Sequence, residues 1–193
     1  EPVATALHAV AVAERSLWRP LGETEALVLG AGAVGLSAAL ILASRGAMKI
    51  VVADTNGGRR ETAKKSGFSE IIDPSCGDFL GESKFGLVID AVGSGATRRV
   101  GSEAICPGGV FIHIGLLDND EGLDVRKITL QEINFIGTYT YTMVDFRATI
   151  EAIHLGVLGN LDWIEKRPLS EGVSAFDDLY NGRTAASKII LVP

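Results

Sequence analysis

The sequence has only two cysteines, Cys76 and Cys106, which lie 30 positions apart (106 − 76). They form no C-x-x-C pair, so reduced thiols and a cytoplasmic protein are expected rather than a disulfide framework. A structural zinc site needs four ligands, which this pair alone does not supply. The three histidines lack the H-E-x-x-H spacing of a metal site. We therefore expect His8, His113 and His154 to be structural residues with satisfied hydrogen bonds.

Basic clusters and long apolar runs are also absent. The chain of 193 residues carries 18 Lys and Arg against 24 Asp and Glu, a net charge of −6. Nucleic acid and anionic membrane surfaces are therefore not expected as partners. No apolar run approaches the roughly 20 residues of a transmembrane helix, and the first residues show no signal-peptide pattern.

Short runs of Val, Ile and Leu alternate with helical patterns over most of the chain. This alternation predicts βαβ units, and therefore an α/β Rossmann fold with a doubly wound parallel sheet. Residues 76–84 are expected to form a loop. Strands are predicted at 25–29, within 48–54 with a core at 50–53, and at 70–73, 85–90, 110–114 and 133–136. Helices are predicted at 4–13, 36–44, 58–66 and 96–105.

The alternation is lost after Gly137. The pattern there predicts a helix at 144–155, a strand at 163–166, a helix at 174–180 and a strand at 188–192. We therefore divide the chain into a Rossmann dinucleotide-binding domain, residues 1–142, and a C-terminal segment, residues 143–193. Residues 1–22 form the leading helix and linker of the first part.

Gly30, Gly32 and Gly35 form a G-x-G-x-x-G pattern between a predicted strand and a predicted helix. This context favours a dinucleotide site over a ligand-free glycine-rich turn. Gly30 permits a tight turn, Gly32 lets the backbone approach a pyrophosphate, and Gly35 allows close helix–strand packing. The amides of Ala33 and Val34 lie at the helix N-terminus, where partial positive charge favours an anion.

Asp54 ends the second predicted strand, 24 positions after Gly30 (54 − 30). A carboxylate there is expected to bind the adenosine ribose hydroxyls and to repel the 2′-phosphate of NADP, so NAD is favoured. Arg59 and Arg60 are a competing signal, because an arginine could hold that phosphate. With Asp54 present, we expect Arg59 to stack on or flank the adenine and Arg60 to be a solvated helix residue.

Three further segments follow predicted strands, at the sheet edge where such folds bind ligands. One interpretation is contact with the nicotinamide half of the cofactor, and the other is ordinary loop structure; the residues alone leave both open. The segments are Ala91, Val92 and Gly93 after the fourth strand, Ile114, Gly115 and Leu116 after the fifth, and Thr138, Tyr139 and Thr140 after the sixth.

In their order and spacing, these motifs resemble the cofactor-binding half of the medium-chain, zinc-dependent alcohol and polyol dehydrogenases. The similarity is greatest to the sorbitol and threonine dehydrogenase branch and extends almost from end to end. Its motifs are Glu1-Pro2, His8-Ala9, residues 28–35, Asp54 with Arg59, residues 90–93, residues 107–109 leading to 114–116, residues 132–137, Ala175-Phe176 and residues 188–191.

The resemblance implies a parent enzyme that transfers hydride between a secondary alcohol or polyol and NAD, with zinc polarising the substrate oxygen. It implies cofactor contacts at Val34, Asp54, Arg59, 114–116 and 138–140. Thr140 departs from the basic residue that this branch often has there.

The main zinc ligands of that family belong to a domain that precedes these motifs. We therefore expect this chain to bind NAD without turnover and to contain no catalytic residue. Glu1 matches an acidic or cysteine position on or near the family's zinc, although a disordered terminal residue is the interpretation we prefer. The segment from Val144 resembles the part that returns to the catalytic domain. Without that partner it is expected to be poorly supported or to dock differently.

Two other functions remain open at this point. The chain could be a stand-alone dinucleotide-binding module, such as a redox sensor, or part of a zinc-free reductase of the same superfamily. Homo-oligomerisation is expected from the resemblance. Residues 123–130, ahead of the sixth strand, are the candidate pairing edge, because unpaired edges invite partners.

Overall fold

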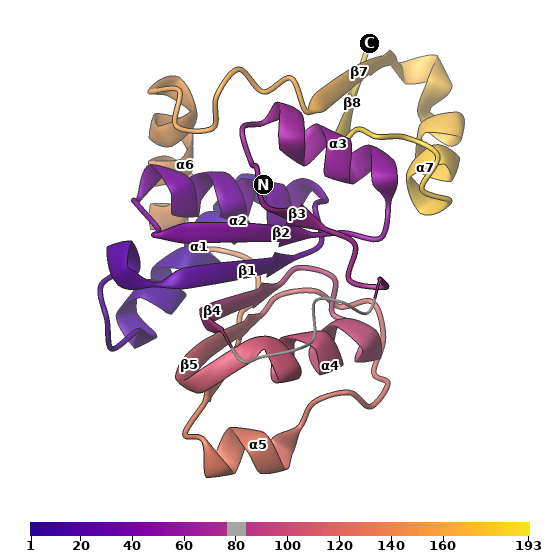
Figure 1. Cartoon of the computed structure of the whole chain (residues 1–193). Coiled ribbons are helices and arrows are strands. Elements are labelled where there is room, and N and C mark those ends of the chain that lie inside the picture. The colour runs from indigo at the N-terminus through magenta and orange to yellow at the C-terminus, as the bar shows by residue number, and fades with distance from the viewer. Residues whose placement is uncertain (77–83) are drawn as a thin grey trace.

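The computed structural model describes residues 1–76 and 84–193. Its centre is a six-stranded, all-parallel sheet with the order β3-β2-β1-β4-β5-β6 (Figure 1). The order reverses between β1 and β4, which confirms the predicted Rossmann fold and creates the crevice where such sheets bind ligands. The strands are β1 (Glu25–Leu29), β2 (Lys49–Ala53), β3 (Ile71–Ile72), β4 (Phe85–Asp90), β5 (Ile105–His113) and β6 (Asn134–Gly137).

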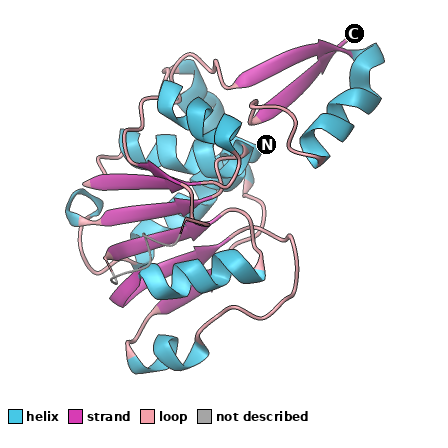
Figure 2. Ribbon diagram, turned by 45° about the vertical axis from the view of Figure 1, so that its right-hand side comes forward, coloured by secondary structure: helices cyan, strands magenta, loops and turns pink. Residues whose placement is uncertain are grey.

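Helices cover both faces of this sheet (Figure 2). Alternate residues of β1 show why: Ala26 and Val28 belong to one buried cluster, and Leu27 and Leu29 to the other. Both faces of the strand are therefore apolar, as expected for a parallel strand covered on two sides. One cluster includes residues of α1 (Pro2–Ser16), α2 (Ala33–Ser44) and α3 (Gly57–Lys65). The other includes a residue of α4 (Gly95–Ala104), and the partly buried Ile128 of α5 (Val125–Leu130) packs against it.

Strand β5 is longer than predicted. It begins at Ile105, which pairs with Phe85, and after an irregularity the pairing resumes between Val110 and Leu87. Gly108 has a positive φ of 71° within this stretch. The Pro-Gly-Gly sequence at 107–109 predicts a break, but the neighbouring strand recruits these residues into an irregular part of the ladder.

Residues 123–130 do not form a pairing edge, so this prediction is wrong. Most of them belong to helix α5, which is capped by Asp124: its carboxylate accepts a hydrogen bond from the amide of Lys127. The edge of the main sheet on this side is β6, which pairs with β5. Of the predicted loop at 76–84, residues 77–83 lie outside the described residues.

The C-terminal segment has a separate small sheet, formed by β7 (Ile164–Pro168) and β8 (Lys188–Val192), which are parallel (Figure 2). It is anchored rather than poorly supported. Leu158 and Trp163 are buried within the larger core cluster, and Asp145 bonds to His8 of α1. The remaining elements are α6 (Met143–His154), α7 (Gly172–Tyr180) and the short 3-10 turns η1 (Leu21–Glu23) and η2 (Leu169–Glu171).

In the described residues, no helix combines the length and the apolar character needed to cross a membrane.

Candidate dinucleotide-binding site

The glycine-rich loop joins β1 to α2 at the reversal point of the sheet. Gly30 has a φ of +93°, which a residue with a side chain rarely adopts, and a Cβ on Gly35 would lie 1.8 Å from the carbonyl oxygen of Gly30. By contrast, a Cβ on Gly32 would meet no atom within 4 Å. The first and third glycines thus serve turn and packing, and the space over Gly32 is open to a ligand.

Helix α2 begins directly beyond this open space. Its N-cap residue is Gly32, which has no side chain to cap the helix. The first amides of a helix have no partner within the helix, so those of Ala33 and Val34 remain available to an anion at the positive end of the helix dipole. The N-terminus of α2 therefore fits a pyrophosphate.

Asp54 follows β2 and is buried, with 7% of its surface exposed. Its Oδ2 accepts a hydrogen bond from the amide of Ala31 at 2.7 Å, and its Oδ1 accepts one from the amide of Asn56 at 2.8 Å. An ionised carboxylate offers about four acceptor positions, so two remain for ligand hydroxyls. Two backbone amides thus fix the carboxylate, which can still accept hydrogen bonds from a ligand.

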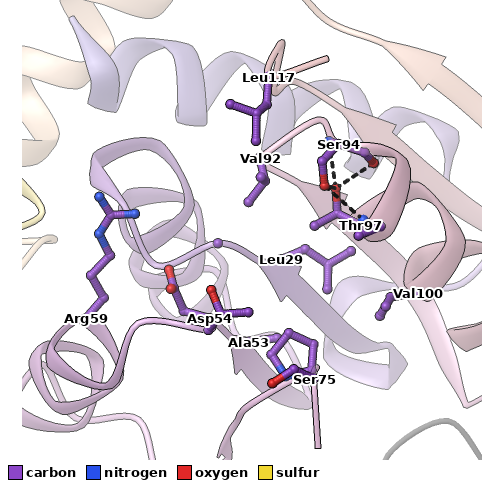
Figure 3. Close-up of a pocket in the computed structure, with 14 residues that line it drawn as sticks. Leu29, Ala53, Asp54, Arg59, Ser75, Val92, Ser94, Thr97, Val100 and Leu117 are labelled. Carbon is purple, nitrogen blue, oxygen red and sulfur yellow. Dashed lines mark hydrogen bonds between the residues drawn. The ribbon is translucent and has the colours of Figure 1, made fainter. Parts of the chain in front are cut away.

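A pocket of about 340 Å³ lies beside this carboxylate (Figure 3). Asp54 and Arg59 approach it from β2 and α3, whereas Val92 and Leu117 approach it from the loops after β4 and β5. The pocket spans the reversal point, as the fold predicts. Its lining residues are Leu29, Gly30, Ala53, Asp54, Thr55, Arg59, Pro74, Ser75, Val92, Ser94, Ala96, Thr97, Val100 and Leu117.

Arg59 lines the pocket with an unused donor. Its Nε is buried and has no hydrogen-bond partner in the described part of the chain. A buried donor without a partner costs about 1–3 kcal/mol, so a ligand that accepts from it or stacks on the guanidinium would be favoured. The position of Arg59 fits the side of an adenosine group.

Arg60 is not the solvated residue that we predicted. Its Nη1 donates to the backbone carbonyl of Asp54 at 2.7 Å and to the carboxylate of Asp73 at 2.8 Å. Hydrogen bonds from Ser75, with a smaller contribution from Arg60, hold the pKa of Asp73 below its ordinary value. The side chain of Arg60 therefore holds the end of β2 in place. A local sequence pattern does not reveal this role.

The loops after β4 and β5 lie backbone against backbone. A Cβ on Gly93, whose φ is +72°, would lie 1.9 Å from the carbonyl oxygen of Gly115, and one on Gly115 would lie 2.0 Å from the carbonyl carbon of Val92. The amide of Leu117 also donates to the carbonyl of Val92. Packing thus requires both glycines, and their contact with a nicotinamide stays a prediction.

Asp90 and Thr97 organise the same corner. The sequence analysis included Asp90 only as part of the motif at 90–93, and it did not predict Thr97. Asp90 Oδ1 accepts from the amides of Val92 and Gly93, and its Oδ2 accepts from the Thr97 hydroxyl at 2.9 Å. Thr97 also forms a capping box with Ser94, the N-cap of α4 (Figure 3). A Ser-x-x-Thr pattern directly after a predicted strand is the signal that could have revealed this arrangement.

Residues 114–116 and 138–140, predicted as cofactor contacts after β5 and β6, do not line the pocket that holds Asp54. Leu116 and Tyr139 are exposed, and Thr140 has a φ of +55°. The Thr138 amide donates to the carbonyl of His113, while its hydroxyl is buried without a hydrogen-bond partner among the residues described. Together with Ala91 and Ile114, these residues follow the carboxyl ends of their strands.

The three histidines differ from one another. His8 bonds to Asp145 at 2.9 Å, in agreement with a structural role. For His113 we predicted satisfied hydrogen bonds, and its Nε2 does not agree. This atom is buried without a hydrogen-bond partner in the described residues and lies 3.7 Å from Asp90 Oδ2. His154 is exposed at the end of α6.

A metal centre does not fit the described residues. Nowhere in ranges 1–76 and 84–193 do three His, Cys, Asp or Glu side chains gather so that they could hold a metal ion. Glu1 is exposed, and its carboxylate lies 3.5 Å from the hydroxyl of Thr5. One carboxylate does not make a zinc site, because catalytic zinc takes three protein ligands.

Comparison with known proteins agrees with this geometry. The family model described as "Zinc-binding dehydrogenase" matches residues 33–154, which is 122 of the 193 residues (154 − 33 + 1). D-xylulose reductase A of Aspergillus oryzae is 26% identical over 189 residues, covering 92% of this chain and 50% of the relative. L-galactonate-5-dehydrogenase of Escherichia coli is 34% identical over 153 residues, covering 76% of this chain and 43% of the relative.

The fold is also similar to solved structures. Acetophenone reductase from Geotrichum candidum, determined in complex with NAD, superposes with a TM-score of 0.84 at 20% identity, covering 96% of this chain and 52% of that one. The chain spans about half the length of the curated relatives it matches. Because the family model matches well over half of its residues, the chain belongs to the zinc-binding dehydrogenase family.

Proposed function

We propose that this chain is the NAD-binding half of an oxidoreductase that transfers hydride between a secondary alcohol or polyol and NAD. The observation that carries the proposal is the buried carboxylate of Asp54, fixed by two backbone amides beside a pocket at the reversal point of the sheet. The zinc-binding dehydrogenase match and the reductases and dehydrogenases among the relatives support the reaction class.

Each part of the cofactor has a proposed place. Asp54 accepts hydrogen bonds from the adenosine ribose, and Arg59 flanks the adenine. The backbone between Gly30 and Gly35, with the amides of Ala33 and Val34, holds the pyrophosphate. The nicotinamide extends toward the strand ends, in the direction of residues 91–93, 114–116 and 138–140.

NAD supplies the hydride acceptor, and this chain supplies binding and orientation. We propose no catalytic residue in it, and the chain alone binds cofactor without turnover. Zinc belongs to the family, but the described residues do not fit it, so we derive no step through a metal. Glu1 as a ligand, a cytoplasmic location and a homo-oligomeric state stay predictions.

The division at residue 143 is also part of the proposal. Helix α7 exposes Val173, Phe176 and Tyr180, which follow one another at helical spacing on one face. Exposed apolar faces of this kind mark interaction sites. Because the chain spans about half the length of its relatives, we propose that residues 143–193 pack against the remaining half of the protein.

The test is a fluorescence titration of the 193-residue chain with NADH and NADPH. We expect NADH to bind more tightly, and Asp54→Ala to weaken NADH binding by roughly 10–100-fold, as loss of a charged hydrogen-bond acceptor does. Glu61→Ala is the matched control, since it removes an exposed carboxylate of α3 that does not line the pocket.

Tighter binding of NADPH than of NADH by the unaltered chain would contradict the role of Asp54. Collapse of the Asp54→Ala fold, measured by circular dichroism, would assign this residue a structural role instead. Zinc-dependent alcohol oxidation by the purified chain would contradict the absence of turnover.

A further inference from the structure

The segment that joins α7 to β8 runs beside α3 (Figure 1). We call residues 182–187 the tether. Its Gly182 carbonyl accepts from the side-chain amide of Asn56 at 2.9 Å, and its Ala185 carbonyl accepts from the hydroxyl of Thr62 at 2.8 Å. The tether thus bonds to the beginning and to the middle of the helix that carries Arg59.

The tether also reaches the glycine-rich loop. The hydroxyl of Ser187 donates to the carbonyl of Ala31 at 2.9 Å, and this hydrogen bond is buried. The backbone amide of Ser187 donates to the carbonyl of Trp163, whose ring is buried in the core. Ser187 therefore connects a buried part of the C-terminal segment to the backbone of the loop.

Asn56 has two roles at once. Its Oδ1 accepts from the amide of Arg59 and caps α3, while its Nδ2 donates to the tether. A Cβ on Gly182, whose φ is +63°, would lie 3.1 Å from that same Nδ2, so the approach is close. The cap of α3 and the tether are therefore fixed by one side chain.

These contacts converge on Asp54. Its carboxylate is held by two amides, those of Ala31 and Asn56. The tether forms hydrogen bonds with the same two residues, with the carbonyl of Ala31 and with the side chain of Asn56. A shift of either residue would move an amide that orients the carboxylate, and buried hydrogen-bonded networks transmit such changes.

We propose that Ser187 and Asn56 are positioning residues that set the orientation of the Asp54 carboxylate, and through it the preference for NAD over NADP. This inference rests on the proposed function. Neither side chain lines the pocket, so both act through Asp54 rather than through contact with the cofactor. The C-terminal segment thereby contributes to cofactor selection from outside the cofactor site.

The experiment compares Ser187→Ala and Asn56→Ser with the unaltered chain, by titration with NADH and NADPH. Serine at position 56 keeps a cap for the Arg59 amide and keeps its own backbone amide, but it loses the donor to Gly182. Thr62→Ala is the matched control, because it removes a tether bond that does not involve Ala31 or Asn56. Melting temperatures are recorded for every variant.

We expect Ser187→Ala and Asn56→Ser each to reduce the ratio of the NADPH to the NADH dissociation constant by about 5-fold, as coupled neighbouring residues do. Thr62→Ala is expected to leave the ratio unchanged. In an Asp54→Ala background, the effects of the first two substitutions on the ratio should disappear. A purely structural tether would lower the melting temperature in all three variants without moving the ratio.

An unchanged ratio in Ser187→Ala and Asn56→Ser would overturn this inference, as would an equal change in Thr62→Ala or an effect that persists without Asp54. If Ser187→Ala does not fold, Asn56→Ser decides the question, since it retains the helix cap. Failure of the unaltered chain to bind NADH would instead refute the proposed function, and the two failures are therefore distinguishable.

Discussion

The two parallel sheets of this chain differ in how well its own residues cover them. In the main sheet, Val28, Ile89 and Ile112 are completely buried between two layers of helices. In the small sheet Ile189 is buried, but Ile190 and Val192 are each 43% exposed. Parallel strands are ordinarily covered on both faces, and a two-stranded sheet has little stability of its own. The central strands of the main sheet are thus covered by the chain itself, whereas the small sheet depends on its attachments.

Ion pairs partly compensate for the limited apolar burial of the small sheet. Arg167 of β7 donates to Glu165 at 2.6 Å and to Asp178 of α7 at 2.8 Å, and Asp178 also accepts from Arg183. These hydrogen bonds raise the pKa of Arg167 and lower that of Asp178. Partly exposed ion pairs of this kind contribute only modestly to the free energy of unfolding. They orient α7 relative to β7 more than they stabilise the unit.

Substitution of glycines offers the strongest test of this contrast. Gly35→Ala should destabilise the chain by about 4 kcal/mol or more, because the new Cβ would lie 1.8 Å from a backbone oxygen that cannot move aside. Gly172→Ala in α7 should change the free energy of unfolding by less than about 1 kcal/mol, because its Cβ would meet only the end of the flexible Leu191 side chain, at 3.3 Å.

Urea denaturation measures both variants. A mild effect of Gly35→Ala would mean that the loop and α2 can separate. The two regions would then tolerate an added methyl group equally well. A severe effect of Gly172→Ala would mean that the small sheet is as closely packed as the main one.

Truncation of matched isoleucines gives the next largest effect. Ile112→Ala in β5 should cost about 3 kcal/mol, because it leaves a cavity in a completely buried layer. Ile190→Ala in β8 should cost less than about 1 kcal/mol, because much of that side chain is already in water. The comparison uses the denaturant midpoint at constant slope. Equal losses at the two sites would contradict the distinction between the sheets.

What could be read from the sequence depends on whether a feature is determined locally. The glycine motif, the strands and Asp54 were predicted because each follows from a local pattern of spacing or apolar residues. The pocket beside Asp54 follows from the strand order that these βαβ units dictate. For these features, local signals and the final structure agree.

Two of the errors, and one contact that was not predicted, concern distant positions. Arg60 bonds to Asp73, 13 positions away, and Ser187 bonds to Ala31, 156 positions away. The extra residues of β5 are recruited by pairing with β4 rather than by their own propensity, since Pro-Gly-Gly normally interrupts a strand. Such partners are chosen by tertiary packing, and no spacing rule indicates them.

The joint between the two regions supplies the smallest expected effect, which depends on pH. Asp145 of α6 accepts from His8 of α1 at 2.9 Å and from both the amide and the hydroxyl of Thr142. Burial acts to raise the pKa of Asp145, but the hydrogen bonds from Thr142 and His8 outweigh it, so the pKa lies below the ordinary value. The folded state therefore favours the ionised carboxylate.

A lowered pKa in the folded state stabilises the fold above the ordinary aspartate value of about 3.9, and this stabilisation is lost as pH falls through the lowered pKa. Asp145→Asn should thus cost about 1 kcal/mol at pH 7, and the cost should shrink as the pH falls toward 3. Glu151→Gln, at an exposed position of the same helix, is the control and should have little effect throughout. If the cost of Asp145→Asn were the same at every pH, the carboxylate charge would not fasten α6 to α1, and the two regions would be joined by packing and by their other hydrogen bonds.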